Sequence, residues 1–560
     1  MDRSAIAAVP SPPRLAWFRT WKLPLLVCAL AGGFALFVTF SGDWIPIFSD
    51  GGMCTLMYYA SLGGAVVLCS AWFALLSGSA PRLRKQIGLS ELAVVLAFVA
   101  VLRVEQVGGN MWPLKLVWRW SPPADAQLDP LKSATALSEQ GAPGAPSADA
   151  TMPGLADYPA FLGAHRHAVV TGVTLATDWK KNPPRQVWRQ KIGAGWSSFA
   201  VVGTAAVTQE QRGDEELVVC YDVPTGHVRW AHADPGRFTS VLGGDGPRAT
   251  PTIADGRVYT IGSTGWLNCL DLATGVPFWK TRNVLDDVGT TPDLEHAAVA
   301  WGRAGSPLLV DERVILPGGG PPASDPAQSK IVSLIAYDQR TGEKVATGGH
   351  QQISYSSPSL FTLDGQRQIV IVNESCITGH DPQTLQELWT FPWEGGSSSS
   401  ATSPQTQQIA PDTLFVSKGY GGGGAVFKVN QAADGWRVTL VWHNRSNLRT
   451  KLSNCVIAGS HVFGLDEGVL ECVDLATGKR LWRNGRYGLG QLLLCGHVLL
   501  VQAESGEVAL VENNPNQFVE LARFAALDDK TWTNPTLAGR YLLVRNAEEA
   551  ACYELPVTGQ

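Results

Sequence analysis

Two kinds of hydrophobic pattern divide the sequence. Before about residue 105 the apolar positions run together, and residues 23–40 and 53–76 are uncharged and mostly apolar. Each run is long enough to cross a hydrocarbon core of about 30 Å as a helix. From residue 158 onward, short segments of alternating apolar and polar residues are separated by turn residues, which is typical of β-strands. The sequence therefore predicts a helical membrane part followed by an all-β part.

A third apolar segment, residues 87–104, is a weaker candidate span because it contains Glu91 and Arg103. The connection between the first two spans holds Asp43 and Asp50 and neither Lys nor Arg. Basic residues precede the first span and follow the second: Arg14, Arg19, Lys22, Arg82, Arg84 and Lys85. The positive-inside rule then places the N-terminus and the second connection in the cytoplasm. A third crossing would put the remaining chain outside the cytoplasm, whereas an interfacial third segment would leave it inside. A cleaved signal peptide is the alternative for the first run.

Residues 121–152 are rich in Pro, Ala, Ser and Asp and have no periodicity, which indicates a flexible tether. We expect three parts: a membrane anchor with two to three transmembrane helices (1–105), a juxtamembrane segment with a Pro/Ala-rich linker (106–157), and the β part (158–560). The net charge is −5, and no basic run stands out beyond the N-terminal part. This distribution argues against nucleic acid as a partner.

A hairpin unit recurs in the β part. A strand ends at Asp, whose side chain can cap the following amides; Thr-Gly makes a tight turn, and the return strand ends in Trp. The repeat positions are Asp222, Gly226, Trp230, Asp271, Gly275, Trp279, Asp338, Gly342, Asp381, Trp389, Asp474, Gly478 and Trp482. The spacing predicts an all-β, eight-bladed β-propeller, with seven blades as the fallback. Residues 186–190 form an outer strand without a blade and would close the ring by pairing with the last strands.

A second motif, hydroxyl-Pro before an apolar run, opens the inner strands at residues 249–253, 305–309 and 356–360. Residues at these starts ring one mouth of the central channel. The candidate ligand-binding residues there are Trp196, Ser197, Arg248, Thr250, Ser306, Ser357, Lys451, Gln491, Trp532 and Asn534. Aromatic, cationic and amide groups converging on one funnel suit a polar planar ligand. The alternative is that these groups end strands and satisfy backbone amides. No catalytic residue and no metal ligand is assigned.

The Asp-x-x-Thr-Gly…Trp unit resembles the repeat of pyrroloquinoline-quinone (PQQ) type propellers over residues 158–555. Two classes share that repeat: the quinoprotein alcohol and glucose dehydrogenases, and the non-enzymatic propeller lipoprotein of the outer-membrane β-barrel assembly machinery. The opening Tyr158-Pro-Ala-Phe-Leu-Gly163 with His165-Arg166 is similar to the opening motif of bacterial proteins in this group. The helical part resembles the anchors of uncharacterised bacterial PQQ-binding-like propellers. The resemblance implies the propeller fold. A likeness to the dehydrogenases would imply PQQ with calcium as cofactors, and a likeness to the assembly lipoprotein would imply protein partners.

The cysteines bear on the choice between these classes. Quinoprotein alcohol dehydrogenases stack their cofactor between a Trp and a disulfide of adjacent cysteines, and this sequence has no Cys-Cys pair. Cys220, Cys269, Cys472 and Cys552 occupy equivalent positions in different blades, too far apart for a disulfide. We interpret them as small buried packing residues. The acids available for calcium include Asp466, Glu467 and Glu504, together with Asn534, and turn positions are the more usual place for such residues.

These observations favour a non-enzymatic binding or scaffolding module for protein or envelope ligands, with no cofactor assigned. We expect it on the periplasmic side of the bacterial cytoplasmic membrane, engaging the membrane and a protein partner. The long inter-blade segments 284–303 and 318–330 widen one face and are the expected recognition surface. The alternatives are a PQQ-dependent quinoprotein dehydrogenase, using PQQ and calcium, and a small-molecule sensor.

Overall fold

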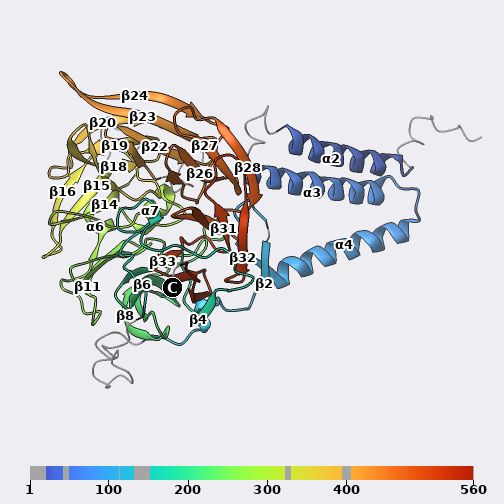
Figure 1. The fold of residues 1–560 in the computed structure, drawn as a ribbon. Coiled ribbons are helices and arrows are strands. Elements are labelled where there is room, and N and C mark those ends of the chain that lie inside the picture. Colours follow the sequence, from blue (N-terminus) through green and yellow to red (C-terminus); the bar gives the residue numbers. More distant parts are fainter. Residues whose placement is uncertain are drawn as a thin grey trace, which may run out of the picture. The chain divides into compact units, whose positions relative to one another are not determined.

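The computed structural model describes residues 20–41, 50–112, 114–131, 152–321, 330–393 and 405–558. The chain forms two compact units, residues 1–121 and 122–560 (Figure 1). The segment 106–157 expected to connect anchor and β part is thus shared between the units, and its residues 132–151 lie outside the described residues. Arg14, Arg19 and Asp43 lie outside them too, as does most of the segment 318–330.

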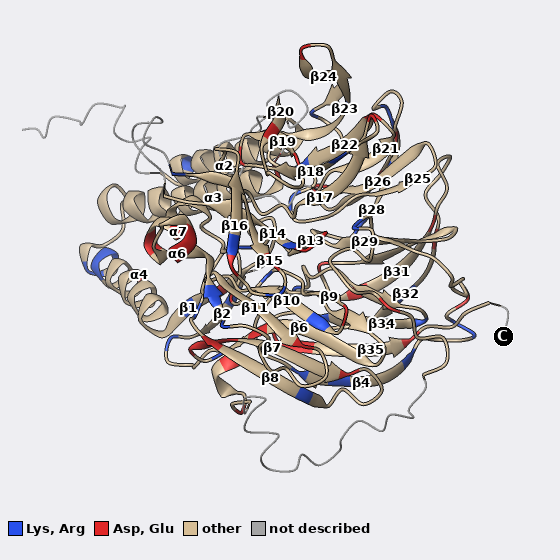
Figure 2. Ribbon diagram, turned by 90° about the vertical axis from the view of Figure 1, so that its left-hand side faces the viewer, with Lys and Arg blue, Asp and Glu red and all other residues tan. Residues whose placement is uncertain are grey.

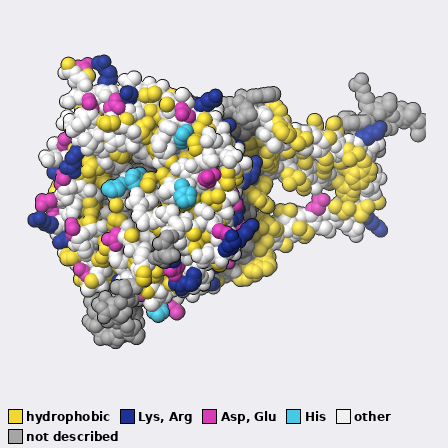
Figure 3. Space-filling model, viewed as in Figure 1, with side chains coloured by type: hydrophobic (Ala, Val, Ile, Leu, Met, Phe, Trp, Pro, Cys, Tyr) yellow, Lys and Arg dark blue, Asp and Glu magenta, His cyan; other side chains and the backbone are white. Residues whose placement is uncertain are grey.

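The described residues of unit 1 form three helices, α2 (Lys22–Phe40), α3 (Gly51–Leu75) and α4 (Pro81–Val101). By length and composition, α2 and α3 qualify as candidate membrane spans among the described residues, and α4 does not. The Asp50 carboxylate caps α3 by accepting from the Met53 amide at 2.8 Å. Hydrophobic side chains cover the visible surface of the helices (Figure 3). The chain leaves α4 directly into a hairpin of β1 (Leu102–Val107) and β2 (Leu114–Trp118).

Unit 2 is an eight-bladed β-propeller, as the repeat spacing predicts. It consists of eight successive antiparallel sheets of four strands, in one of which a further strand joins. The first four blades have these strands: β5–β8 (Ala200–Val202, Ala205–Arg212, Glu215–Asp222, Val228–Pro235), β9–β12 (Thr252–Ala254, Arg257–Ile261, Trp266–Asp271, Arg282–Asn283), β13–β16 (Leu308–Val310, Arg313–Gly319, Val332–Asp338, Lys344–Gly348) and β17–β20 (Ser359–Leu363, Gln366–Val372, Cys376–His380, Glu387–Pro392).

The last four blades continue the pattern. Their strands are β21–β24 (Gln407–Ala410, Thr413–Lys418, Gly423–Ala432, Gly435–Asn444), β25–β28 (Val456–Ala458, His461–Asp466, Val469–Asp474, Arg480–Arg486), β29–β32 (Gln491–Cys495, Val498–Gln502, Glu507–Glu512, Glu520–Ala525) and β33–β35 (Thr536–Ala538, Tyr541–Arg545, Glu549–Glu554) with β4 (Arg185–Lys191). The short β3 (Val169–Val170) adds to β29 in parallel. In the described part of unit 2, the short helices η2 (Asp125–Gln127), α6 (Val284–Val288) and α7 (Pro292–Ala298) lie outside the blades.

The predicted ring closure is present. Strand β4 pairs antiparallel with β35, placing Trp188 opposite Cys552. The buried Arg545 reinforces this junction by donating to the carbonyls of Gly193 at 2.9 Å and Gln209 at 2.7 Å. Burial lowers the pKa of Arg545 to about 10. The last blade is therefore completed by β4, from the beginning of the β part, and the outer edge of β35 is paired at the junction.

The repeat works as a joint between neighbouring blades. The Trp230 indole of the first blade donates to the Leu272 carbonyl of the second at 2.9 Å, one residue after the repeat's Asp271. The same ring covers Gly275, where a Cβ would lie 2.5 Å from it. Trp188, Trp279 and Trp442 make the same bond to the next blade, at 2.7, 3.2 and 2.8 Å. Asp271 meanwhile accepts from the Thr274 amide at 2.8 Å, which fixes the turn as predicted.

Among the five blades that carry the Asp-x-x-Thr repeat, the one that lacks Trp is followed by the one that lacks Gly. Ala346 stands at the Trp position of the third blade, and Leu385 stands at the Gly position of the fourth. Leu385 is fully buried and packs in one cluster with Ala346 and Ala336. The leucine side chain thus fills the space that an indole ring occupies at the other joints, so the two departures from the repeat compensate each other.

Gly275→Ala is expected to destabilise the propeller by more than Gly256→Ala. Both glycines have a positive φ, +72° and +71°, so Ala costs about 1–2 kcal/mol in backbone conformation at either site. A Cβ at Gly256 meets no atom within 4 Å, whereas at Gly275 it collides with the Trp230 ring. We expect Gly275→Ala to lower the free energy of unfolding further, by about 1–3 kcal/mol. Denaturation of the full chain in detergent, followed by Trp fluorescence, measures the free energy of unfolding of each variant. Equal losses for the two variants would show that the ring does not depend on this joint.

Candidate functional site

The first strands of the blades surround the channel. Contacts between β5 and β9, β13 and β17, β25 and β29, and β33 and β5 place these strands innermost. The residues that precede them therefore gather at one end of the channel. We call this end the mouth, and the end reached by the last residues of these strands the base.

An aromatic and cationic group occupies the mouth. The rings of Trp196 and Trp532, which precede blades one and eight, lie with centroids 5.1 Å apart. The Lys530 ammonium lies 4.1 Å from the Trp532 ring centroid and 5.1 Å from that of Trp196. The Trp532 indole donates to the Glu504 carboxylate at 2.8 Å. These four side chains, here called the mouth cluster, combine two aromatic faces with one charge of each sign.

The hydroxyl and amide residues predicted to line the mouth join neighbouring blades. The Ser306 hydroxyl accepts from the Thr250 amide, and the Ser357 hydroxyl from the Ser306 amide, both at 2.9 Å. Gln491 donates to the Trp532 carbonyl at 2.9 Å. The Ser197 hydroxyl accepts from the Gln209 amide at 3.2 Å, and the Asn534 carbonyl accepts from Ser198 at 2.9 Å. These bonds match the alternative in which the groups satisfy backbone amides, and they engage the side chains of Ser306, Ser357 and Gln491 within the protein.

Arg248 and Lys451 are also engaged. Arg248 donates to the carbonyls of Gly243 at 2.9 Å and Gly244 at 2.6 Å, and its guanidinium lies 4.6 Å from the Phe238 ring centroid. Burial lowers the pKa of Arg248 to about 10. Lys451 forms an ion pair with Glu467 at 3.0 Å, with side chains only 1% and 7% exposed. Arg248 thus organises a loop, and Lys451 belongs to a buried pair.

Some polar atoms of the mouth are buried without a hydrogen-bond partner among the described residues. They are the Trp196 indole nitrogen, the Asn534 amide oxygen and the hydroxyls of Ser453 and Thr533. All four precede the inner strands of blades one, six and eight. Two of these residues, Trp196 and Asn534, were predicted from the sequence.

Some residues of the mouth were not predicted from the sequence. Lys530 was not among the candidates, although it stands two residues before Trp532. Trp301 and Tyr355, which precede blades three and four, stack with centroids 5.8 Å apart. Tyr355 stands two residues before the hydroxyl of the Ser357-Pro358 motif, as Trp196 stands before Ser198, so its position was a signal; Trp301 stands five residues before Ser306 and had none.

A raised surface borders the mouth. The loop 236–247 between the first two blades packs on α7 through Phe238 and His296, whose ring centroids are 6.3 Å apart. The apex of the loop exposes Val241 and Leu242 by 49% and 45%, and α7 exposes Leu294 by 41%. We call these three residues the apolar rim. Part of the predicted long segment 284–303 thus contributes to the rim, together with a loop that the sequence analysis did not single out.

The base is covered by the lead-in segment, residues 152–176. Tyr158 bridges to Val201 of β5, and the Pro159 carbonyl accepts from the Ile253 amide of β9 at 2.8 Å. The Gly203 amide, just after β5, donates to the Asp157 carboxylate at 2.9 Å. The buried Arg166 side chain reaches along the channel and donates to the carbonyls of Pro307 and Pro358, which directly precede β13 and β17, the latter at 2.9 Å; burial lowers its pKa to about 9. The conspicuous Tyr158–Arg166 motif is therefore a plug that ties blades one, two, three and four together.

The residues present do not fit a calcium–quinone site. All ten cysteines are free, and burial raises the pKa of Cys220, Cys472 and Cys552 to about 12, in keeping with packing residues. Burial raises the pKa of Asp466, but the Arg449 guanidinium outweighs this effect and holds the pKa below its usual range. Glu467 forms an ion pair with Lys451. In the described part of the chain, no three His, Cys, Asp or Glu side chains lie close enough to share a metal ion. The carboxylates of this region therefore form ion pairs with basic side chains or accept hydrogen bonds within the protein.

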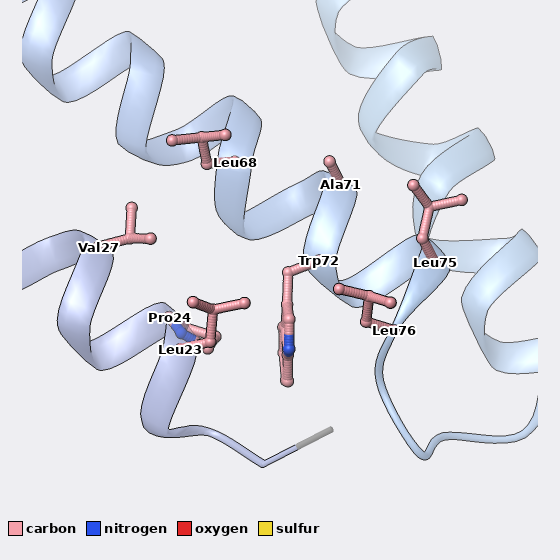
Figure 4. A pocket seen from close by; sticks show the side chains of 8 residues that line it. All are labelled: Leu23, Pro24, Val27, Leu68, Ala71, Trp72, Leu75 and Leu76. Carbon is pink, nitrogen blue, oxygen red and sulfur yellow. The ribbon is translucent and has the colours of Figure 1, made fainter. Parts of the chain in front are cut away.

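A cavity of about 250 Å³ lies between α2 and α3 in unit 1 (Figure 4). Its lining consists of Leu23, Pro24, Val27, Leu68, Ala71, Trp72, Leu75 and Leu76. Such an apolar lining provides little to orient a ligand, and in a candidate membrane-spanning pair it is the kind of surface that acyl chains fill.

The fold and repeat joints define a propeller of the PQQ-repeat type. The chain belongs to the family described as outer membrane protein assembly factor BamB, whose model matches residues 182–320 and 214–484. A search of curated proteins finds no match. Among solved structures, BamB from Moraxella catarrhalis is 16% identical, covering 66% of this chain and 100% of that one with a TM-score of 0.45. A europium-containing methanol dehydrogenase is 12% identical, covering 71% and 98% with a TM-score of 0.41. A quinohemoprotein alcohol dehydrogenase from Comamonas testosteroni is 14% identical, covering 78% and 85% with a TM-score of 0.40.

Glu467→Gln is expected to destabilise the propeller by about 3–5 kcal/mol, because it leaves the Lys451 ammonium buried without its carboxylate. Adding Lys451→Met removes the buried charge, so the double variant should recover at least half of that loss. Denaturation of both variants in detergent measures the free energies of unfolding. A double variant no more stable than Glu467→Gln would contradict a role for this ion pair.

Proposed function

We propose that this chain is a membrane-associated binding scaffold that recognises a protein partner at the mouth of its propeller. The observation that carries the proposal is the apolar rim, where Val241, Leu242 and Leu294 expose apolar side chains on elements that pack together. Exposed apolar groups clustered beside a polar and aromatic surface are typical of protein interaction sites. The base is covered by the lead-in segment, so the mouth is the end of the channel with a surface available for a partner.

Contacts with the rest of the protein hold the loop of the apolar rim in one conformation, which is expected of a recognition surface. Arg248 donates to the carbonyls of Gly243 and Gly244 next to the apex. A Cβ at Gly243 would lie 2.9 Å from Trp301, so the backbone of the loop lies directly on an aromatic ring. A preorganised loop loses less conformational entropy on binding, which gives affinity to a small apolar contact. The mouth cluster next to it adds two indoles and a lysine, residue types suited to an interface centre and its rim.

The family's name supports an envelope role, because it describes a factor of outer membrane protein assembly. We place the propeller on the extracytoplasmic side of the cytoplasmic membrane, which requires α4 to cross as a third span after α2 and α3, with the basic residues before α2 and after α3 in the cytoplasm. In that compartment an extended or partly folded envelope protein is a suitable partner for the rim.

Photo-crosslinking tests the recognition surface. p-Benzoylphenylalanine placed at Leu242 in the full chain, in growing cells, should give protein adducts that the same probe at Val345 does not give. Val345 is a matched control because it is equally apolar and 47% exposed, but lies on β16, the outermost strand of the third blade. Leu294→Asp should reduce the Leu242 adduct at least five-fold. Adducts of equal yield at both sites, or no effect of Leu294→Asp, would overturn the proposal.

The quinoprotein alternative has its own test. Titration calorimetry of the full chain in detergent with PQQ and Ca²⁺ is expected to show no saturable heat, because Asp466 and Glu467 are held in ion pairs and no cysteine pair is present. Saturable micromolar binding that Trp532→Ala weakens would instead support the dehydrogenase hypothesis and count against a purely binding role. Thermal shifts in the presence of the same ligands provide an independent reading.

A further inference from the structure

The β1–β2 hairpin of unit 1 has two unlike faces. Alternate residues on and beside β2 point to one side, and all five are apolar and exposed: Trp112 (64%), Leu114 (36%), Leu116 (42%), Trp118 (54%) and Trp120 (69%). The rings of Trp118 and Trp120 stack with centroids 5.6 Å apart. On the other side Glu105 pairs with Arg103 and Lys115, both at 3.8 Å. The period of two therefore separates a Trp/Leu face from a charged face.

The position of the hairpin is fixed against α3. The Tyr59 hydroxyl of α3 donates to the carbonyl of Met111 in the hairpin turn at 3.0 Å. A Cβ at Gly51, the first residue of α3, would lie 2.9 Å from the Asn110 side chain. The turn thus lies at the end of α3 where that helix begins. If α3 spans the bilayer, the hairpin is at the level where this end of α3 leaves the hydrocarbon.

The C-terminal end of α4 lies at the same depth as the beginning of α3. Five residues separate the end of α3 from the start of α4, which carries Arg82, Arg84 and Lys85 in its first turns (Figure 2). It ends at Val101, where Arg119 of the hairpin donates to the Val99 carbonyl at 2.7 Å. Because its far end joins an element that contacts the beginning of α3, α4 runs back along α3 in the opposite direction (Figure 1). Glu91, half-way along α4, adds to the basic residues of its first turns, so its sequence ranks below α2 and α3 as a span.

We propose that the Trp/Leu face of the hairpin (Trp112, Leu114, Leu116, Trp118, Trp120) binds the boundary between lipid headgroups and acyl chains, at the extracytoplasmic end of α3. Tryptophan prefers this boundary because its ring is apolar and its indole N–H is polar. The paired strands satisfy their own backbone groups, and the charged face can remain toward water. The hairpin then fixes the depth of α4 and makes it a third crossing. This inference is independent of the proposed rim, since it concerns unit 1 alone.

Photo-crosslinking of the full chain in phosphatidylethanolamine–phosphatidylglycerol proteoliposomes tests the proposal. p-Benzoylphenylalanine at Leu116 should form lipid adducts, detected by mass spectrometry, at least five-fold more than the same probe at Lys115. Lys115 is the matched control because it is the adjacent residue of β2 and points to the charged face. Adducts of Leu116 to a second copy of the chain or to another segment of the same chain, or equal lipid yields at the two sites, would overturn it.

Fluorescence quenching decides the case if the probe at Leu116 gives no adduct at all. Lipids brominated near the top of the acyl chain should quench a smaller share of the Trp emission in a variant with Trp112, Trp118 and Trp120 replaced by Phe than in the wild type. Trp266→Phe, in the propeller, should leave the quenched share unchanged. An unchanged share in the triple variant would reject the lipid contact.

Discussion

The joint between a tryptophan of one blade and the Asp-x-x-Thr-Gly loop of the next is the interaction on which the propeller depends. A blade by itself is a small twisted sheet, and its faces can be buried only against its two neighbours. The indole of Trp230 meets this need twice, because its ring covers Gly275 and its N–H donates to the Leu272 carbonyl. One residue type thus provides apolar burial and a directed bond at the same place. At the ring closure Trp188 repeats the arrangement on Gly226, so β4 is held by the same chemistry as the outer strands of other blades.

The joints also restrict what the channel can do. Polar side chains at the starts of the inner strands, such as Ser306 and Gln491, are engaged with backbone groups of adjacent blades, so they stabilise the ring rather than offer a free surface. The carboxylates of Asp466 and Glu467 are engaged by cations. Because these polar groups are engaged within the protein, the aromatic side chains and the loops are what this end of the channel can offer to a partner. The mouth cluster and the apolar rim consist of these residue types.

The sequence predicted the ring because the repeat is itself the inter-blade contact: a Trp and a Gly that must touch recur at one-blade spacing. Residues 186–190 could be assigned to the last blade because they carry the Trp without a preceding hairpin. The mouth was predicted less completely. Trp196 and Trp532 were found through their position before an inner strand, but Lys530 and the loop 236–247 have no repeating pattern. Whether a polar residue faces a ligand or a neighbouring blade depends on distances of about 3 Å across blades, which spacing along the chain does not encode.

The two ends of the channel differ because the chain passes one of them before it builds any blade. The lead-in segment has to reach β4 from unit 1, and along the way it places Arg166 against the carbonyls of Pro307 and Pro358. A buried guanidinium satisfies several carbonyls at once, which suits the point where inner strands converge and leave acceptors pointing inward. The lead-in segment thus covers the base while Arg166 stabilises the ring from within the channel, which leaves the loops of the mouth for recognition. The loops there, including 236–247 and the α6–α7 segment, can then vary in length and composition without disturbing a joint between blades.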